Sequence, residues 1–428
     1  ANMAFPGALN TRTKSRKVTR GGTIAALDVG SSKVVCFIAK VDDPGSIRVV
    51  GIGHQISRGV RSGGIVDMEA AETAIGTTVH AAETMAGEQI REVLVSLSGG
   101  QPESQTLVAE AAVTGAEIGD GDVRRALAEA RKLDVSADAE LIHSIPVGYA
   151  IDGTKGIRDP RGMVGERLGV RMNVVTAAAG PVRNLSTCVG RCHLGVEGFV
   201  MSPYAAGLSC LVEDEMELGV TVIDMGGGTT SMAVFNDGKM VWCDSIPLGG
   251  GHVTNDIARG LTTPVAQAER LKTLYGSAVS AVSDEREMID VPQVGEEERG
   301  QTNHVPKSLL VGIIQPRMEE IFELVHGRLD GSGFAKAAGR RVVLTGGASQ
   351  LSGVRELATN VLDKQVRLGR PLRIGGLATN VSGPAFASAA GLLAYAMQQN
   401  HEMPALAPTP EKSPGWWGRV NGWLRENL

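Results

Sequence analysis

Two segments of the same design occur far apart in this chain, and they restrict its fold more than any other feature. In each, a run of apolar and β-branched residues ends in an Asp-x-Gly turn and a second such run follows: TIAALDVGSSKVVCFIAKV from Thr23, and GVTVIDMGGGTTSMAVF from Gly219. This pattern predicts a β-hairpin in both places. At about 150 residues per domain, a chain of 428 residues has room for several cores. The repeat therefore predicts two related lobes, each with its own sheet, rather than a solenoid of short repeats.

The turns of these segments carry residues suited to a phosphorylated ligand. Glycine lets backbone N–H groups approach phosphate oxygens, small hydroxyl residues add donors, and aspartate can hold hydrated Mg²⁺. A third segment, VVLTGGASQLSGV (Val342–Val354), places a glycine pair between a predicted strand and a predicted helix, where an adenine or ribose could lie against bare backbone. Taken singly, each segment has a plainer interpretation, an ordinary hairpin turn or strand-to-helix turn. The candidate residues are Asp28, Gly30, Ser31, Ser32 and Lys33 in the first turn, Asp224, Gly226, Gly227, Gly228, Thr229 and Thr230 in the second, and Gly346 and Gly347 in the third.

Charge and cysteine usage exclude several other classes of protein. A net charge of −5 gives no general attraction to nucleic acid. The five cysteines are scattered and lack paired CxxC spacing, which favours neither a disulfide framework nor a zinc site. Because no charged-then-apolar leader and no long uninterrupted apolar run occurs, we expect neither secretion nor a membrane-spanning helix. Any membrane contact would be peripheral.

Further elements are predicted between the three segments. Residues 69–85 and 121–133 have helix-forming compositions, the second with Asp122 as its expected cap. Strand-like residues at 91–100 and 139–153 could form a separate small α/β module with them. After a polar, acidic stretch at 280–306, apolar residues recur at helical spacing and predict a helix whose apolar stripe is buried. These residues are Leu309, Leu310, Ile313, Ile314, Met318, Ile321, Phe322 and Val325.

Both ends of the chain have compositions unlike the rest. Residues 11–20 carry five basic residues and almost nothing apolar, which predicts a disordered arm that is simply solvated or weakly attracted to anionic lipid. After Gln399 a proline-rich stretch predicts a flexible linker. The last segment, SPGWWGRVNGWLRENL, holds three of the four tryptophans.

On a helix, this last segment is amphipathic. Tryptophan prefers the boundary between acyl chains and headgroups, where arginine can reach anionic phosphates, and sixteen residues are fewer than the roughly 20 that span a bilayer. We therefore predict a peripheral membrane anchor at 413–428; the alternative is that the tryptophans dock on the protein's own body. The predicted membrane-binding residues are Trp416, Trp417, Arg419, Val420, Trp423, Leu424, Arg425 and Leu428.

The three ligand-binding segments, in this order, resemble the actin, Hsp70 and sugar-kinase superfamily. Within it the chain is most similar to the FtsA family of bacterial cell-division proteins, over about residues 22–396 and the tail. The resemblance is carried by HSIPVGYAIDG (His143–Gly153), GIRDPRGMVGERL (Gly156–Leu168), RCHLGVEGFV (Arg191–Val200) and IPLGGGHVTNDIARGLTTPVAQAERLK (Ile246–Lys272).

This resemblance implies an α/β, actin-like two-lobed ATPase fold with an inserted small α/β subdomain. Two helices rich in small residues, at 202–211 and 382–396, would cross closely at the hinge between the lobes. The implied boundaries are a basic arm at 1–21, the first lobe at 22–90, 179–211 and 380–397, the insertion at 91–178, the second lobe at 212–379, a linker at 398–412 and the membrane helix at 413–428.

The resemblance also assigns roles to the candidate residues. Asp28 and Asp224 would organise Mg²⁺, the two glycine-rich turns would hold the phosphates of ATP, and Gly346 and Gly347 would flank adenosine. Glu269 and Lys272 match the helix that contacts ribose in the superfamily, although an i, i+3 pair of this kind is also typical of a solvated helix surface.

Two departures from the superfamily pattern concern hydrolysis. Ser202 stands where many relatives place a glutamate that positions the attacking water, and Ser231 stands where many place an aspartate near the metal. A serine is a poor proton acceptor at neutral pH. We therefore expect ATP binding with slow or no hydrolysis.

The implied function is that of a filament-forming actin homologue at the division site. It would bind the C-terminal peptide of the tubulin homologue FtsZ through its second lobe, and anionic lipid on the cytoplasmic face of the inner membrane through its tail. It would also recruit later division proteins, and no nucleic acid is expected as a partner. Two alternatives stay open: a small-metabolite kinase on the same scaffold, and an actin-like scaffold of a pilus or secretion machine.

Overall fold

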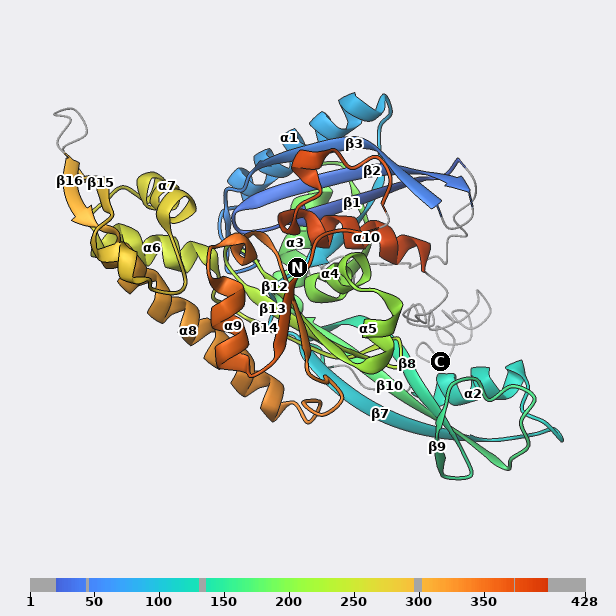
Figure 1. Ribbon diagram of the computed structural model, residues 1–428. Helices are drawn as coiled ribbons and strands as arrows, with labels where there is room; N and C mark the ends of the chain where they lie inside the picture. The colour runs from blue at the N-terminus through green and yellow to red at the C-terminus, as the bar shows by residue number, and fades with distance from the viewer. Residues whose placement is uncertain (1–20, 44–45, 131–135, 296–301, 373, 399–428) are drawn as a thin grey trace, which may run out of the picture.

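The structure, a computed structural model, describes residues 21–43, 46–130, 136–295, 302–372 and 374–398. Two lobes, each built on a five-stranded sheet, lie side by side, and a third, smaller sheet projects at one end (Figure 1). The predicted basic arm up to residue 20, nearly all of the linker and the tryptophan-rich tail fall outside the described residues.

The first sheet begins with an antiparallel meander of β1 (Thr23–Val29), β2 (Lys33–Asp43) and β3 (Ser46–Ile56). Two later strands, β6 (Glu92–Leu97) and β11 (Gly195–Met201), add parallel to β1, so that the strand order is β11-β6-β1-β2-β3. The apolar runs of β1 and β2 are buried almost throughout, as expected for central strands of a covered sheet. The hairpin predicted from Thr23 is confirmed.

The second sheet repeats this arrangement. It consists of β12 (Val220–Met225), β13 (Thr230–Asn236), β14 (Lys239–Ile246), β17 (Arg341–Thr345) and β18 (Gln365–Leu368), in the order β14-β13-β12-β17-β18. The first three strands are antiparallel, and β17 and β18 run parallel to β12. The prediction of two lobes with related sheets is therefore confirmed.

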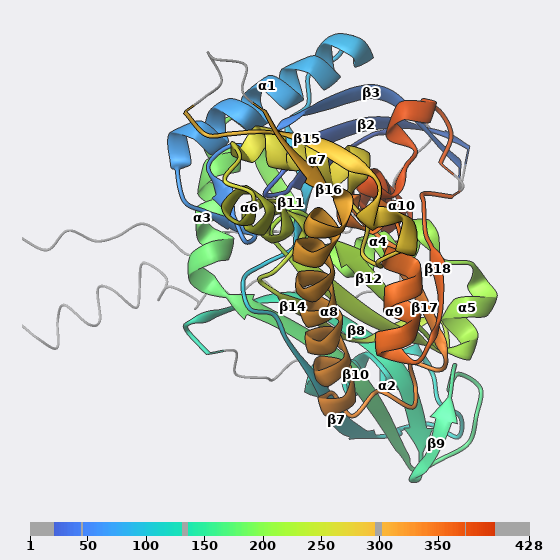
Figure 2. The same ribbon diagram turned by 60° about the vertical axis from the view of Figure 1, so that its left-hand side comes forward.

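Helices cover the faces of both sheets (Figure 2). In the first lobe α1 (Met68–Ala86) packs on β3, and α3 (Ala179–Arg191) lies against α1. The Asp67 side chain accepts an N–H from Ala70 and caps the start of α1, and Gly87, at φ 71°, ends it in the left-handed conformation. The helix predicted at 69–85 is confirmed.

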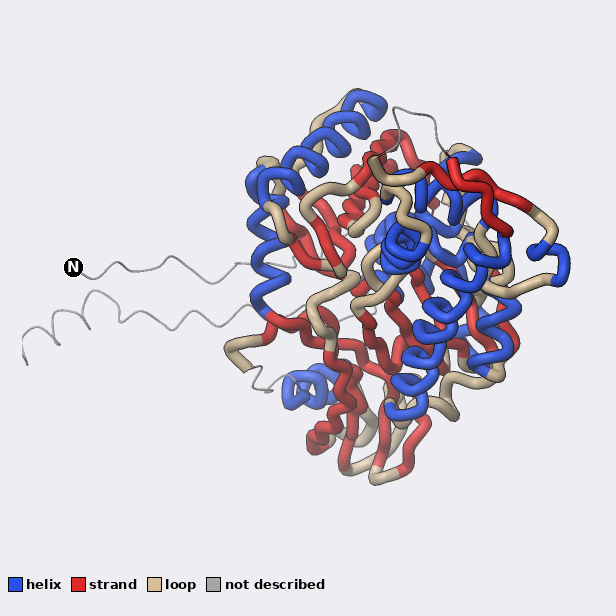
Figure 3. Tube along the Cα trace, turned by 90° about the vertical axis from the view of Figure 1, so that its left-hand side faces the viewer, coloured by secondary structure: helices blue, strands red, loops and turns tan. Residues whose placement is uncertain are grey.

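The second lobe carries α6 (Gly250–Gly260), α7 (Val265–Tyr275), α8 (Lys307–Gly331) and α9 (Val354–Leu362). Most of the predicted apolar stripe of α8 is buried. Two of its residues are not fully buried: Leu309 is 47% exposed, and Ile313 is partly buried. Seen from the side of α8, strands form much of the interior and helices cover it (Figure 3).

The insertion has its own sheet and its own core. Its strands are β7 (Glu103–Ala112), β8 (Ala139–Ile151), β9 (Thr154–Ile157) and β10 (Arg167–Ala178), in the order β7-β10-β8-β9, and α2 (Asp120–Ala130) packs on one face. Its buried residues include Ile118, Val123, Ala126, Leu127, Leu168, Val170, Met172 and Val174.

Two details of the insertion differ from the sequence prediction. The expected start at residue 91 is wrong, because β6 lies between β1 and β11 in the first sheet, and the first strand of the insertion begins at Glu103. The apolar core of β6, VLVSL, is what a strand buried on both faces requires. Asp122 is not the cap residue of α2 either, since it lies in the first turn, where its carboxylate accepts the Gly119 N–H at 2.9 Å.

The insertion touches both lobes. The ring of His143, on β8, accepts the backbone N–H of Met201 at 3.0 Å, at the end of β11. The buried Asn173 side chain, on β10, donates to the carbonyl oxygen of Met240 in β14, also at 3.0 Å. The insertion is therefore fastened across the junction between the lobes and does not hang from one of them.

The predicted hinge helices are α4 (Ser202–Cys210) and α10 (Ala387–Met397), and they cross closely as expected. A Cβ on Gly391 would lie 1.7 Å from the carbonyl oxygen of Ala205, so only glycine allows this approach. Shorter elements complete the fold: β4 (Val60–Arg61), β5 (Gly64–Ile65), α5 (Glu213–Leu218), β15 (Met288–Pro292), β16 (Thr302–Pro306), η1 (Val282–Glu285), η3 (Gly347–Gln350), η4 (Thr379–Val381) and η5 (Pro384–Phe386).

Candidate nucleotide-binding cleft

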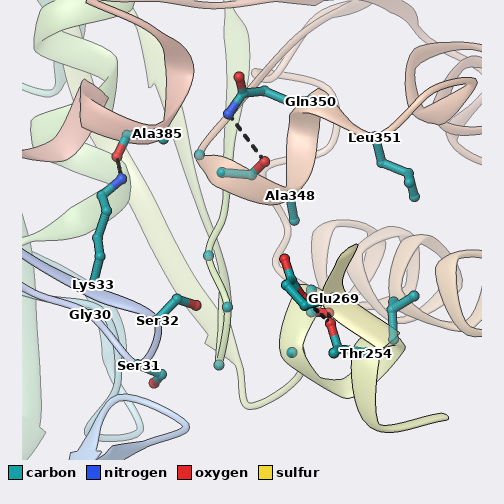
Figure 4. Close-up of a pocket in the computed structure, with 18 of the residues that line it drawn as sticks. Gly30, Ser31, Ser32, Lys33, Thr254, Glu269, Ala348, Gln350, Leu351 and Ala385 are labelled. Atoms are coloured by element: carbon teal, nitrogen blue, oxygen red, sulfur yellow. Dashed lines mark hydrogen bonds between the residues drawn. The ribbon is translucent and has the colours of Figure 1, made fainter. Parts of the chain in front are cut away.

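A cavity of about 930 Å³ opens between the two lobes, with walls from both sheets and from the start of both hinge helices (Figure 4). The structure brings together all but one of the residues predicted to bind nucleotide or metal. Those that line the cleft are Asp28, Gly30, Ser31, Ser32, Lys33, Asp224, Gly226, Gly227, Gly228, Thr229, Glu269, Lys272, Gly346 and Gly347.

Thr230 is the predicted site residue that does not line the cleft. It is the first residue of β13, fully buried, and its hydroxyl donates to the carbonyl oxygen of Leu248 at 2.9 Å. The alternation of side chains along a strand turns it away from the cleft that Thr229 faces. Thr230 supports the second turn from behind.

Two aspartates form the floor of the cleft. Asp28 and Asp224 occupy matching places near the carboxyl ends of the central strands β1 and β12. Each is oriented by a serine that the sequence analysis missed: the hydroxyl of Ser96 donates to Asp28, and that of Ser388 donates to Asp224 at 2.8 Å. Both serines lie in segments predicted for other roles, a strand at 91–100 and a hinge helix at 382–396, and each reaches its aspartate from an element distant in sequence.

Burial makes the charged form of both carboxyl groups costly. It raises the pKa of Asp28, against the opposing hydrogen bond from Ser96. Burial also raises the pKa of Asp224, to about 6, and the negative charge of Asp28 adds to that effect. A cation placed between the two groups would relieve this cost.

Lys33 is the cation beside these aspartates. Its Nζ donates to the carbonyl oxygen of Ala385 (Figure 4). It also lies 4.2 Å from the centre of the Phe386 ring. Burial lowers the pKa of Lys33, whereas the charges of Asp28 and Asp224 raise it.

The two glycine-rich turns meet across the cleft. A Cβ on Gly227 would lie 1.6 Å from Oγ of Ser32, and one on Gly228 would lie 2.2 Å from Oγ of Ser31. Ser31 also accepts the Gly63 N–H at 3.2 Å, from the turn between β4 and β5. The absence of side chains on the second turn therefore brings backbone and hydroxyl donors from both lobes into one small region, as a phosphate group requires.

The predicted ribose pair lies in the opposite wall. The Lys272 ammonium donates to Glu269 at 2.7 Å, to the hydroxyl of Thr254 at 2.8 Å and to the carbonyl oxygen of Gly250 at 3.1 Å. The Lys272 side chain is only 14% exposed, whereas that of Glu269 is 54% exposed, so the lysine end of the pair is withdrawn from solvent and the carboxylate end is not. Thr254, on α6, was missed because a lone threonine in a helix carries no signal of its own.

The glycine pair after β17 closes the cleft on a third side. Gly346 has φ 85°, and a Cβ there would lie 2.4 Å from the carbonyl oxygen of Met225 and 2.6 Å from Oδ1 of Asp224. Gly347 has no such restriction, since its Cβ would meet only the Ala385 side chain at 3.8 Å. Position 346 therefore requires glycine, because of its φ angle and its close neighbours, whereas position 347 has room for a side chain.

The residues present fit a magnesium–nucleotide complex. Ser57 lines the cleft, and its buried hydroxyl has no hydrogen-bond partner among the described residues. Such groups are costly unless a ligand or water satisfies them. The described residues hold no cluster of three or more His, Cys, Asp or Glu side chains placed for a metal ion, but Mg²⁺ bound with phosphates needs only one or two carboxylates.

Ser231, which stands where many relatives have an aspartate near the metal, makes a contact between the lobes. The hydroxyl of Ser231 donates to the carbonyl oxygen of Ser98 at 3.1 Å, and that of Ser245 donates to the same oxygen at 2.7 Å. A carboxylate at position 231 would face that carbonyl oxygen. Among the described residues lining the cleft, the carboxylates are Asp28, Asp224 and Glu269.

Within the described part of the chain, no helix is both long enough and apolar enough to cross a bilayer. The residues predicted to bind membrane, from Trp416 to Leu428, lie outside the described residues.

Two family models match the sequence. "Cell division protein FtsA" matches residues 221–391, and "SHS2 domain inserted in FTSA" matches residues 99–176. The second match begins after β6, in agreement with the sheet topology.

Proteins with the name "Cell division protein FtsA" are similar to the chain over nearly its full length. The protein of Rhizobium meliloti is 44% identical, covering 100% of this chain and 99% of the relative. That of Pseudomonas aeruginosa is 36% identical over 90% and 92% of the two chains, and that of Escherichia coli K12 is 33% identical over 96% and 100%.

Solved structures with the same fold are much more distant in sequence. The PilM–PilN type IV pilus biogenesis complex contains a chain that matches with a TM-score of 0.61 at 17% identity, covering 88% of this chain and 98% of that one. MreB5 of Spiroplasma citri bound to ADP matches with a TM-score of 0.52 at 14% identity, covering 88% and 96%. These likenesses concern the fold alone and confirm the predicted actin-like, two-lobed architecture.

Proposed function

The chain belongs to the FtsA family of cell-division proteins, and from this premise we propose that it is an ATP-binding, filament-forming actin homologue that tethers the FtsZ ring to the membrane. The observation that carries the proposal is the inter-lobe cleft, where two glycine-rich turns meet above a pair of aspartates. Fold neighbours support nucleotide binding, since the MreB5 structure has ADP bound.

Different residues of the cleft bind different parts of the nucleotide. Ser31, Ser32 and the backbone of 226–229 hold the phosphates, while Glu269 and Thr254 face the sugar. Asp28 and Asp224 hold Mg²⁺, which when bound neutralises the charge of the phosphate oxygens. The serines at 96 and 388 keep the two carboxylates aimed at it.

Hydrolysis in this cleft is slow or absent. The two aspartates at the phosphate end are committed to the metal, and Glu269 is bonded to Lys272 at the sugar end. Ser202, which lines the cleft, is too weak a base to take a proton from water at neutral pH. Nucleotide therefore acts mainly by holding the lobes together, and the protein is not primarily an enzyme.

Membrane attachment is assigned to the tail and is reversible. Burial of six large apolar side chains offers on the order of 10–15 kcal/mol, and ordering sixteen residues at about 1–2 kcal/mol each cancels most or all of it. These side chains are Trp416, Trp417, Val420, Trp423, Leu424 and Leu428. One tail binds weakly, and a filament of many tails binds firmly because each further tail acts at a high effective concentration.

The remaining roles follow from family membership. The second lobe binds the C-terminal peptide of FtsZ, and the insertion makes contacts between subunits and recruits later division proteins. The protein then works on the cytoplasmic face of the inner membrane. The pilus alternative gains nothing from the PilM likeness, which shows only the fold. The kinase alternative requires a catalytic base, and the carboxylates among the described lining residues are the ones assigned here to the metal and the sugar.

Electron microscopy on a monolayer of anionic lipid tests the proposal. With ATP and Mg²⁺ we expect membrane-bound filaments, and without nucleotide few or none. Trp416→Glu is the control, because it places a charge on the predicted apolar face of the tail and changes no residue of the cleft, and it should abolish attachment. Filaments that form equally without nucleotide, or attachment that survives Trp416→Glu, would contradict the proposal.

A further inference from the structure

The cleft has few positive charges to offer a phosphate chain. Among its described lining residues the cations are Lys33 and Lys272. Lys272 is bound to Glu269, Thr254 and Gly250 in the sugar wall. Lys33 lies on the other side of the cleft, next to the first phosphate turn (Figure 4). Lys33 is therefore the one described cation of the lining placed to meet phosphate.

An aromatic ring fixes the position of the Lys33 ammonium. Its Nζ lies 4.2 Å from the centre of the Phe386 ring, and it donates to the carbonyl oxygen of Ala385. A cation over an aromatic face is attracted by the negative potential of the ring. The side chain of lysine is otherwise long and flexible, so without such a support its ammonium would sample many positions.

The ring itself is held firmly. Phe386 is 9% exposed. It is stacked on Phe37 with 6.2 Å between ring centres, and the ring of His54 meets it edge-on at 5.8 Å. Phe37 belongs to β2, the strand that Lys33 begins, so ring and lysine are anchored to the same strand.

The turn that carries Phe386 also contacts the other ligand-binding parts of the cleft. Its Pro384 carbonyl oxygen accepts the Gly346 N–H at 3.1 Å, and Ser388, two residues after Phe386, donates to Asp224. The sequence of this turn, PAF, precedes hinge helix α10 directly.

We propose that Phe386 is a positioning residue for Lys33, holding its ammonium at the phosphate end of the cleft before a phosphorylated ligand enters. This inference rests on the proposed binding of nucleotide. Because the lysine is already in place, binding does not have to meet the entropic cost of ordering it. Phe386 therefore increases ligand affinity indirectly, by positioning Lys33 to contact the phosphate groups of the ligand.

The test is a double-mutant cycle measured by titration calorimetry of the full chain with ATP and Mg²⁺. Phe386→Met keeps an apolar side chain of similar length and removes the ring face, and Phe386→Tyr keeps the ring. We expect Phe386→Met to bind ATP about tenfold more weakly, which corresponds to about 1.4 kcal/mol, and Phe386→Tyr to bind within about twofold of wild type. Phe386→Leu replaces the methionine variant if that variant does not fold, as judged by circular dichroism.

The second arm repeats the measurement in a Lys33→Met background. If Phe386 acts through Lys33, Phe386→Met has no further effect there, whereas a general packing defect weakens binding equally in both backgrounds. Equal losses in both backgrounds, or unchanged binding by Phe386→Met, would overturn the inference. Failure of the wild-type chain to bind ATP would instead overturn the proposed function.

Discussion

The carboxyl group of Asp224 makes the stability of the ligand-free protein depend on pH. Burial raises its pKa from 3.8 to about 6, so between these values the folded protein binds more protons than the unfolded chain. The free energy of unfolding therefore falls as the pH rises through that range. At about 1.4 kcal/mol for each pH unit, the loss is about 2–3 kcal/mol.

We therefore expect Asp224→Asn, which cannot ionise, to be more stable than wild type at pH 7 by about 1–3 kcal/mol without nucleotide. The difference should shrink toward zero near pH 4. Denaturant unfolding at several pH values measures it. A difference that does not change with pH would show that the carboxyl group ionises at its ordinary pKa.

Gly346 and Gly347 form a matched pair for testing the third wall of the cleft. Gly346→Ala places a Cβ 2.4 Å from the Met225 carbonyl oxygen at φ 85°, whereas Gly347→Ala meets nothing closer than 3.8 Å. We expect the first change to cost about 2–4 kcal/mol of unfolding free energy and to weaken ATP binding. The second should stay within about 1 kcal/mol of wild type. Similar stabilities for both variants, measured by denaturant unfolding, would contradict the geometry.

At the residue scale the sequence predicted what chain-local motifs encode. The Asp-x-Gly turns and the glycine pair lie in the cleft as expected. Ser96, Ser388 and Thr254 were missed, because their roles arise only when distant elements meet. Thr230 was assigned to the wrong side of its strand, since a motif read as a block ignores the alternation of side chains.

The helices α4 and α10 cross closely. Gly391→Ala would place a Cβ 1.7 Å from the Ala205 carbonyl oxygen. We expect a loss of at least about 3 kcal/mol, because helix backbones in contact cannot move apart without disturbing the hinge core. Thermal unfolding by circular dichroism measures it.

Gly190→Ala in α3 is the matched control for that change. Nothing lies within 4 Å of its Cβ position, and alanine favours helix over glycine by about 1 kcal/mol. This variant should be slightly more stable than wild type. A stable Gly391→Ala protein would mean that the two helices are not in contact in solution.

At the element scale, strongly periodic segments were predictable and assignments to sheets were less so. The helix α8 and the two hairpins follow directly from the spacing of apolar residues. The strand β6 was assigned to the insertion because its strand-like residues lie between the two predicted helices, yet hydrogen bonding to β1 and β11 decides its sheet. Pairing between distant strands leaves no mark in the local pattern of either.

For the whole molecule, the two-lobed architecture follows from one long-range repeat, and residues of both lobes line one cleft. The second turn contacts the first so closely that glycine is needed at Gly227 and Gly228. The insertion is bonded to the first lobe through His143 and to the second through Asn173. We therefore expect that a ligand that draws the lobes together would also change the position of the insertion.

The most direct test of this account is titration calorimetry of the full chain with ATP and Mg²⁺, on wild type and on Asp224→Ala. Asp214→Ala, which removes an exposed carboxylate of the same lobe outside the cleft, is the control. We predict one bound nucleotide for wild type and for the control, and at least roughly tenfold weaker binding by Asp224→Ala, a loss of about 1.4 kcal/mol or more. Equal affinity of Asp224→Ala and wild type would contradict it.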